Sequence, residues 1–145
     1  MQLISSAFFH QASIPPQYTC DGADLSPDLT WSNVPDDTQS FVLVVHDPDA
    51  PAGDWLHWLV INIPATTTTV LTGAVPTGGT EVVNDFGRSS WGGPCPPTGS
   101  HRYYFELYAL NVPTITATTY ADVMTAVQQY TLAKTELMGT YQRSQ

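Results

Sequence analysis

Three stretches rich in β-branched and aromatic residues constrain the fold of this chain most. They are FVLVV at residues 41–45, LHWLVINI at residues 56–63 and RYYFELYAL at residues 102–110, and each is followed closely by a proline. Runs of this length, bounded by turn-forming residues, are typical of buried strands. The first is apolar throughout, which predicts a strand covered on both faces. Shorter strands are expected around Ile4, Leu29 and Trp31.

Helical signals come only late in the chain. Thr119, with Asp122 three residues on, resembles a capping box. Residues 131–138 are expected to add a further helical turn or two, with Gly139 as a left-handed cap. We therefore predict a mainly-β fold, a β-sandwich or a similar sheet architecture with one or two short C-terminal helices. The apolar residues at helical spacing are Tyr120, Val123, Met124, Val127 and Tyr130.

Length and charge narrow the classes of protein. The 145 residues fit a single domain, 1–145, that buries a core of its own. The net charge is −9 with only four Lys and Arg residues, which argues against nucleic acid or an anionic membrane as a partner. Nothing approaches the roughly 20 apolar residues of a membrane span. The N-terminus lacks the features of a signal peptide, so we expect a cytoplasmic protein, although a processed precursor would look the same.

The two cysteines, Cys20 and Cys95, carry no paired metal-ligand spacing. In a reducing compartment they are expected to be free and partly buried thiols. A disulfide between them stays open at this point.

The segment HDPDAP follows the first apolar run and places two carboxylates on a stiff turn. Its prolines fix their own φ angles and restrict the residues before them. Side-chain alternation continues Phe41, Leu43 and Val45 into Asp47, which should therefore point into the same interior. A carboxylate in that position needs partners. They are either the local amides of an Asx-type turn or the groups of a binding site.

The second run contains His57 within the sequence WLHWLVINI. A histidine in so apolar a strand is more often a core residue than a ligand-binding one. Alternation predicts one face formed by Trp55, His57, Leu59 and Ile61, and the other by Leu56, Trp58, Val60 and Asn62.

A glycine–proline loop, GGPCPPTGS at residues 92–100, precedes the third run. It is rigid at its prolines and sterically open at its glycines, which lets backbone amides approach a ligand closely. Alternation in the strand that follows puts His101 and Tyr103 on one face and Arg102 on the other. Arg102 is the obvious anion ligand by charge, but its orientation favours a structural ion pair, with Asp49 or another of the thirteen acids.

Several motifs together resemble the phosphatidylethanolamine-binding protein family. They are DPDAP at residues 47–51, HWLVINIP at 57–64 and GPCPPTGSHRYYFELYAL at 93–110. YTCDGADLSPDLTWSNVP at 18–35 and LAKTELMGTYQR at 132–143 are similar to its short bacterial and archaeal branch, called Raf-kinase-inhibitor-like. The resemblance covers nearly the whole chain in the same order.

The resemblance implies a β-sandwich with a central antiparallel sheet and a small anion pocket near the surface. It implies a non-catalytic protein that binds phosphate-like anions or phosphorylated headgroups, with a regulatory role in some members and no cofactor. It also implies that self-association into a homodimer is to be expected. The pocket positions fall on Asp47, Ala50, Pro51, Trp55, His57, Pro96, Pro97, His101 and Tyr103.

Three alternatives compete with a simple binding pocket. Loops around the pocket could inhibit a protease or a kinase, whose identity the sequence leaves unknown. Asp47, His57 and His101 have the composition of a two-His-one-carboxylate metal site, although no short motif supplies two of the ligands. A hydrolase would need a nucleophile such as Cys95, since no Gly-x-Ser-x-Gly elbow is present. For the favoured pocket we expect Asp47 to orient a histidine, whose protonated form binds the anion.

Overall fold

The computed structural model describes residues 1–143, which form two antiparallel sheets, one α-helix and a short 3-10 helix. The larger sheet has the strand order β6-β4-β3-β7-β8 and the smaller one β1-β2-β5. The larger contains β3 (Ser40–Asp47), β4 (Trp55–Pro64), β6 (Thr80–Glu81), β7 (His101–Leu110) and β8 (Thr131–Tyr141). The smaller contains β1 (Gln2–Ile4), β2 (Leu29–Ser32) and β5 (Thr69–Val70). The helices are α1 (Tyr120–Tyr130) and η1 (Pro16–Tyr18).

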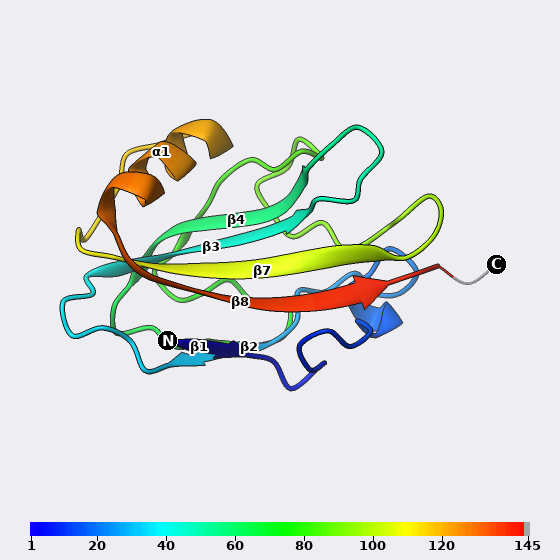
Figure 1. Ribbon diagram of the computed structural model, residues 1–145, viewed down its shortest axis with the longest axis horizontal. Helices are drawn as coiled ribbons and strands as arrows, with labels where there is room; N and C mark the ends of the chain where they lie inside the picture. The colour runs from blue at the N-terminus through cyan, green and yellow to red at the C-terminus, as the bar shows by residue number, and fades with distance from the viewer. Residues whose placement is uncertain (144–145) are drawn as a thin grey trace.

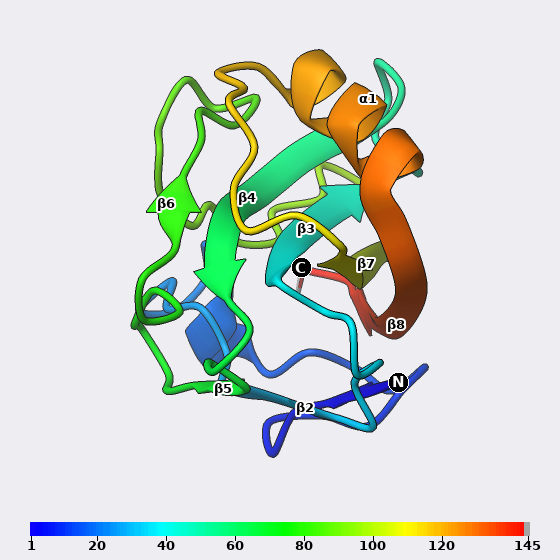
Figure 2. The same cartoon turned by 90° about the vertical axis from the view of Figure 1, so that its left-hand side faces the viewer.

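The elements stack in three layers, with α1 on one face of the larger sheet and the smaller sheet on the other (Figures 1 and 2). Alternate residues of β3 therefore enter two different cores. Phe41 and Val45 pack between the two sheets, whereas Val42 and Val44 pack against the helix. The apolar run at 41–45 is buried on both faces, as predicted, and the predicted sandwich with a central antiparallel sheet is confirmed.

Sequence patterns also located the helix. The side chain of Thr119 caps α1 by accepting a hydrogen bond from the Asp122 amide at 3.2 Å. Val123 and Val127 are the buried residues of its inner face. No helix among residues 1–143 is long and apolar enough to cross a bilayer.

The helical prediction for residues 131–138 is wrong, because these residues belong to strand β8. β8 pairs with β7 along its whole length, and this tertiary pairing outweighs the local preference. Gly139 is not a left-handed cap. A Cβ at this position would lie 2.6 Å from Cγ1 of Ile14, so the glycine allows the N-terminal segment to pack against the strand.

The predicted faces of β4 are also wrong beyond His57. Val45 pairs with Trp58, but the next residue, His46, pairs with Leu56. His57 is therefore the extra residue of a β-bulge, which resets the alternation. Leu59, expected beside His57, instead packs in the core under α1.

The expectation of two free, partly buried thiols is wrong as well. Cys20 and Cys95 form a disulfide, and both residues are exposed. Their Cα atoms lie 5.5 Å apart although 75 residues separate them in the sequence. Such proximity is a property of the tertiary fold that cysteine spacing does not reveal.

Candidate functional site

The ends of β3, β4 and β7 meet at one end of the larger sheet (Figure 1) and surround a cavity of about 270 Å³. The structure brings all of the predicted pocket residues to this cavity, while the binding of a ligand there stays a prediction. The predicted residues that line it are Asp47, Ala50, Pro51, Trp55, His57, Pro96, Pro97, His101 and Tyr103. Ala52, Phe86 and Cys95 line it too.

Asp47 combines the two roles considered for it. Its Oδ1 accepts a hydrogen bond from the Asp49 amide at 2.7 Å, which closes an Asx turn. Its Oδ2 lies 2.7 Å from Nδ1 of His101. The carboxylate is 3% exposed and both of its oxygens are occupied. Asp47 therefore orients His101 from behind and has no oxygen left without a protein partner.

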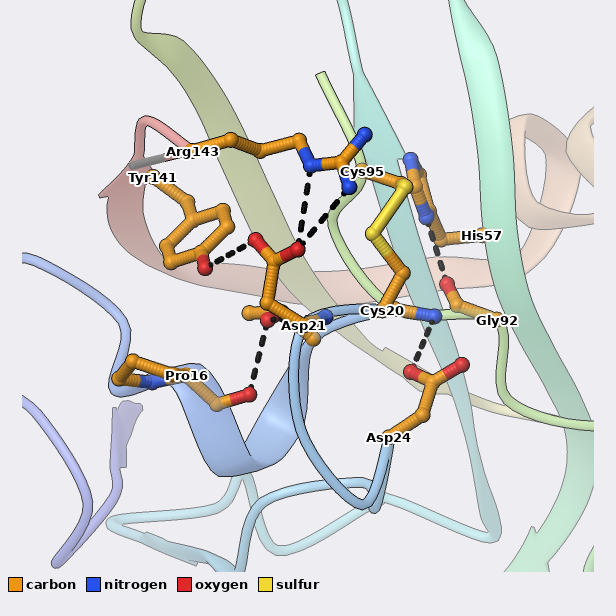
Figure 3. Close-up of a disulfide and its surroundings, with 11 residues drawn as sticks. Pro16, Cys20, Asp21, Asp24, His57, Gly92, Cys95, Tyr141 and Arg143 are labelled. Atoms are coloured by element: carbon orange, nitrogen blue, oxygen red, sulfur yellow. Dashed lines mark hydrogen bonds and ion pairs between the residues drawn. A yellow bond between two sulfur atoms is a disulfide. The ribbon is translucent and has the colours of Figure 1, made fainter. Parts of the chain in front are cut away.

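His57 is held by a different kind of partner. Its Nδ1 donates to the carbonyl oxygen of Gly92 at 2.6 Å (Figure 3). Burial lowers the pKa of His57, and this effect outweighs the opposing influence of the Gly92 carbonyl and of Asp47, Asp24 and Asp85. The neutral imidazole with its proton on Nδ1 is thus the favoured form.

Tyr103 lies beside both histidines, with ring centroids 5.3 Å from His57 and 6.4 Å from His101. Burial first, and then the nearby carboxylates Asp47 and Asp49, raise its pKa, so the phenol keeps its proton. Within residues 1–143 its buried hydroxyl has no hydrogen-bond partner. An unpaired buried hydroxyl is costly, and a ligand in the cavity would satisfy it.

A loop that the sequence did not single out supports His57. Asn84 is buried, and its side chain donates to the His57 carbonyl at 2.8 Å and to the Ser90 carbonyl at 2.7 Å. The same loop positions Phe86, which packs edge-on against both His57 and Trp55. The turn sequence NDFG marks this loop in the sequence, but its contact with His57 arises only in the tertiary fold.

The glycine–proline loop is anchored from the other side (Figure 3). The amide of Gly93 donates to Asp24 Oδ1 at 2.9 Å, and Cys95 is bonded to Cys20. A Cβ on Gly93 would lie 2.1 Å from that carboxylate oxygen, so only glycine permits the contact. Nearby, Asp21 accepts from the Tyr141 hydroxyl at 2.6 Å. The disulfide and these hydrogen bonds together set the position of the Gly92 carbonyl that orients His57.

Arg102 points away from the cavity, as alternation predicted, and forms the expected ion pair. Its guanidinium binds both carboxylate oxygens of Asp49, at 2.8 and 2.9 Å. These hydrogen bonds lower the pKa of Asp49 to about 2. The residues that line the cavity therefore include no arginine or lysine.

The metal-site alternative finds no geometric support in the described part of the chain. Residues 1–143 contain no group of three His, Cys, Asp or Glu residues placed to hold a metal ion. Asp47 and His101 are hydrogen-bonded to each other instead. A cysteine nucleophile is also removed, because Cys95 is bonded to Cys20.

Comparison with known proteins gives consistent matches over almost the full length. The profile described as "Phosphatidylethanolamine-binding protein" matches residues 4–142. A UPF0098 protein of Methanothermobacter thermautotrophicus is 39% identical over 150 residues, which cover 99% of each chain. The crystal structure of a putative phosphatidylethanolamine-binding protein homolog from Chlamydia trachomatis superposes with a TM-score of 0.93 at 37% identity, over 99% of this chain and 97% of the other. Escherichia coli YbcL, titled a new member of the mammalian PEBP family, gives 0.92 at 35%, over 99% and 98%.

Proposed function

This chain belongs to the phosphatidylethanolamine-binding protein family, and from that premise we propose that its cavity binds a phosphate-type oxyanion or a phosphorylated headgroup without transforming it. The observation that carries the proposal is the set of polar groups at the base of the cavity. Two histidines and an unpaired phenol converge there, each held by the surrounding protein.

The source of positive charge in this proposal is a histidine and not an arginine. Arg102 is engaged by Asp49 on the outer side. Nδ1 of His101 is hydrogen-bonded to the carboxylate of Asp47, and the protonated ring would donate to the anion through its other nitrogen. Apolar side chains, which include Trp55, Phe86 and Pro51, line the cavity, and a less polar environment strengthens these interactions.

A non-catalytic role fits the chemistry of the site. A hydrolytic enzyme needs an activated nucleophile within reach of a base. Cys95 is in a disulfide, and Tyr103 holds its proton tightly because its pKa is raised. Asp47 has both oxygens committed to Asp49 and His101.

Calorimetric titration of inorganic phosphate at pH 6 and pH 8 tests the proposal. We expect tighter binding at pH 6, because protonated His101 contributes a charge-assisted hydrogen bond. Equal affinity at the two pH values, or no saturable binding at either, would count against a histidine-centred site.

Other expectations stay predictions. Inhibition of a protease or a kinase through the surrounding loops, and self-association into a dimer, need assays against such enzymes and sedimentation measurements. A cytoplasmic location also needs a direct measurement by cell fractionation. The exposed disulfide weakens the basis of that expectation, since disulfides persist mainly in oxidising compartments.

A further inference from the structure

Each cavity imidazole has one ring nitrogen committed to the protein, and in both cases it is Nδ1. In His57 this atom bonds to the Gly92 carbonyl oxygen, and in His101 it bonds to the Asp47 carboxylate. Nε2 is therefore the nitrogen that each ring can offer to a ligand. Within residues 1–143, no hydrogen bond joins the two imidazoles or connects either Nε2 atom to Tyr103.

The two Nε2 atoms have opposite hydrogen-bonding character when His57 is neutral and His101 is protonated. A carbonyl oxygen can only accept, so Nδ1 of His57 carries the proton and Nε2 of the neutral ring is an acceptor. The partner of His101 is a carboxylate, and in the protonated ring both nitrogens donate, Nδ1 to Asp47 and Nε2 to a ligand.

The surroundings of His57 keep it neutral. Asp47, Asp24 and Asp85 act to raise its pKa, but burial has the larger effect and lowers it. Phe86 and Tyr103 pack edge-on against the ring and bring no charge. His57 as a residue is 3% exposed, and within residues 1–143 no hydrogen bond to its Nε2 is found.

We propose that the cavity selects oxyanions that carry a proton, a class in which hydrogen phosphate and the monoanions of phosphate monoesters are the main members. The ligand hydroxyl would donate to Nε2 of His57. Its charged oxygens would accept from Nε2 of His101 and from the Tyr103 hydroxyl. This inference rests on the oxyanion-binding function proposed above and names the ligand class of the same cavity.

Sulfate and carboxylates lack that proton at neutral pH. One of their oxygen lone pairs would face the lone pair of His57, a residue that is 3% exposed. A buried acceptor left without a donor is costly, so we expect sulfate to bind about 10- to 100-fold more weakly than phosphate.

Inorganic phosphate and sulfate at pH 8 form a matched pair, because both are then mainly dianions of the same tetrahedral shape. Their affinities for the intact protein are measured by calorimetry at equal ionic strength. A phosphate preference of about tenfold or more supports the inference. Equal affinities would overturn it and leave the oxyanion site standing. Failure of both anions to bind would overturn the proposed function and the inference together.

The tautomer of His57 gives an independent readout without any substitution. Nitrogen-15 NMR of histidine-labelled protein distinguishes a protonated from an unprotonated ring nitrogen. We expect Nε2 of His57 to stay unprotonated when phosphate is bound, and Nε2 of His101 to gain a proton. An imidazolium at His57 in the phosphate complex would contradict the inference.

A substitution tests the same atom. His57→Gln places an amide near the position of Nε2, and an amide either donates or accepts. We expect this variant to lose the preference, with phosphate and sulfate affinities within about twofold of each other because each finds a matching amide atom. His46→Gln, a histidine substitution outside the cavity lining, is the matched control and should keep the preference. A preference that survives in His57→Gln would contradict the assigned role of His57.

Discussion

The two faces of the larger sheet carry histidines of opposite kinds. On the cavity side, His57 and His101 each have one nitrogen held by the protein. On the opposite side, both nitrogens of His46 face acids, with Nδ1 2.6 Å from Asp54 and Nε2 3.2 Å from Glu106. His46 has an acid beside each nitrogen and does not line the cavity, so we assign it a structural role. We propose a binding role for His57 and His101, which line the cavity and each have one ring nitrogen hydrogen-bonded to the protein.

The face of the larger sheet that carries His46, called the outer face here, holds a network of ion pairs. Lys134 lies 3.1 Å from Glu106, and Arg102 pairs with Asp49. Burial opposes the ionisation of Glu106, yet His46 and Lys134 lower its pKa to about 2. The outer acids are thus matched by fixed cations, whereas the cavity has only histidines to provide positive charge. Alternation along β7 places His101 at the cavity and Arg102 on the opposite face, where it binds Asp49.

Replacing His101 tests the functional difference between the two faces most directly. His101→Ala removes the donor that Asp47 orients and leaves that carboxylate without its partner. We expect phosphate affinity to fall by about 100-fold or more, since charge-assisted hydrogen bonds in buried sites are strong. His46→Ala is the matched substitution on the outer face and should leave the affinity unchanged. Isothermal titration measures the phosphate affinity of both variants, and circular dichroism checks that both are folded. A similar loss of affinity in both would show that the two faces are not separate in function.

Matched substitutions of one carboxylate on each face test the same difference, because Asp→Asn removes the charge and keeps the shape of the side chain. Asp47→Asn leaves an amide oxygen that still accepts from His101 but removes the negative charge beside that ring. We expect phosphate binding to weaken by about tenfold and to lose most of its dependence on pH. Asp54→Asn makes the equivalent change beside His46 and should alter neither. The measurement is the affinity at pH 6 and pH 8 for each variant, and an unchanged pH dependence in Asp47→Asn would contradict the assigned role of Asp47.

The sequence predicted the features that depend on a single strand and missed those that depend on contacts between strands. Alternation along β3 and β7 was sufficient to place Asp47, His101 and Arg102, because those strands are regular on this stretch. It failed past His57, because a β-bulge is created by pairing with β3 and leaves no pattern in β4 alone.

Features that join distant segments were beyond the sequence for the same reason. The Cys20–Cys95 disulfide and the support of His57 by Asn84 both depend on loops that meet only in the folded chain. Residues 131–141 form a strand because β7 offers them an edge, which no local propensity reports. Motif resemblance located the cavity residues, while the hydrogen-bond partners that decide their chemistry required the structure.

The contributions of His46 and His57 to stability depend on pH with opposite signs. Burial disfavours the His46 imidazolium, but Glu106 and Asp54 outweigh it and raise the pKa. Its stabilising contribution is therefore complete below the ordinary histidine pKa of about 6.5 and is lost as the pH rises through the higher folded value. His57, whose pKa is lowered, lowers stability as the pH falls below about 6.5, because the unfolded chain then takes up a proton first.

Urea unfolding of the wild type and two variants between pH 5 and pH 9 measures this difference. His46→Gln should cost on the order of 0.5–1 kcal/mol near pH 5.5 and less near pH 9, since solvent screens this partly exposed pair. For His57→Gln, the loss in free energy of unfolding relative to the wild type should be smaller near pH 5.5 than near pH 9. If the free energy of unfolding depends on pH in the same way in both variants, the pKa shifts of His46 and His57 are not opposite in direction.

Arg102 gives the smallest expected effect and the strictest test of the separation between the faces. Arg102→Leu removes the most obvious anion-binding side chain near the cavity, as judged from composition alone. Because the guanidinium points outward and is bound to both oxygens of Asp49, we expect phosphate affinity to stay within about twofold of the wild type. The residual change would come from Asp49, which lies next to the turn of Asp47. A loss of tenfold or more in the titration would place a cation at the ligand after all, and the cavity would no longer depend on histidine alone for its positive charge.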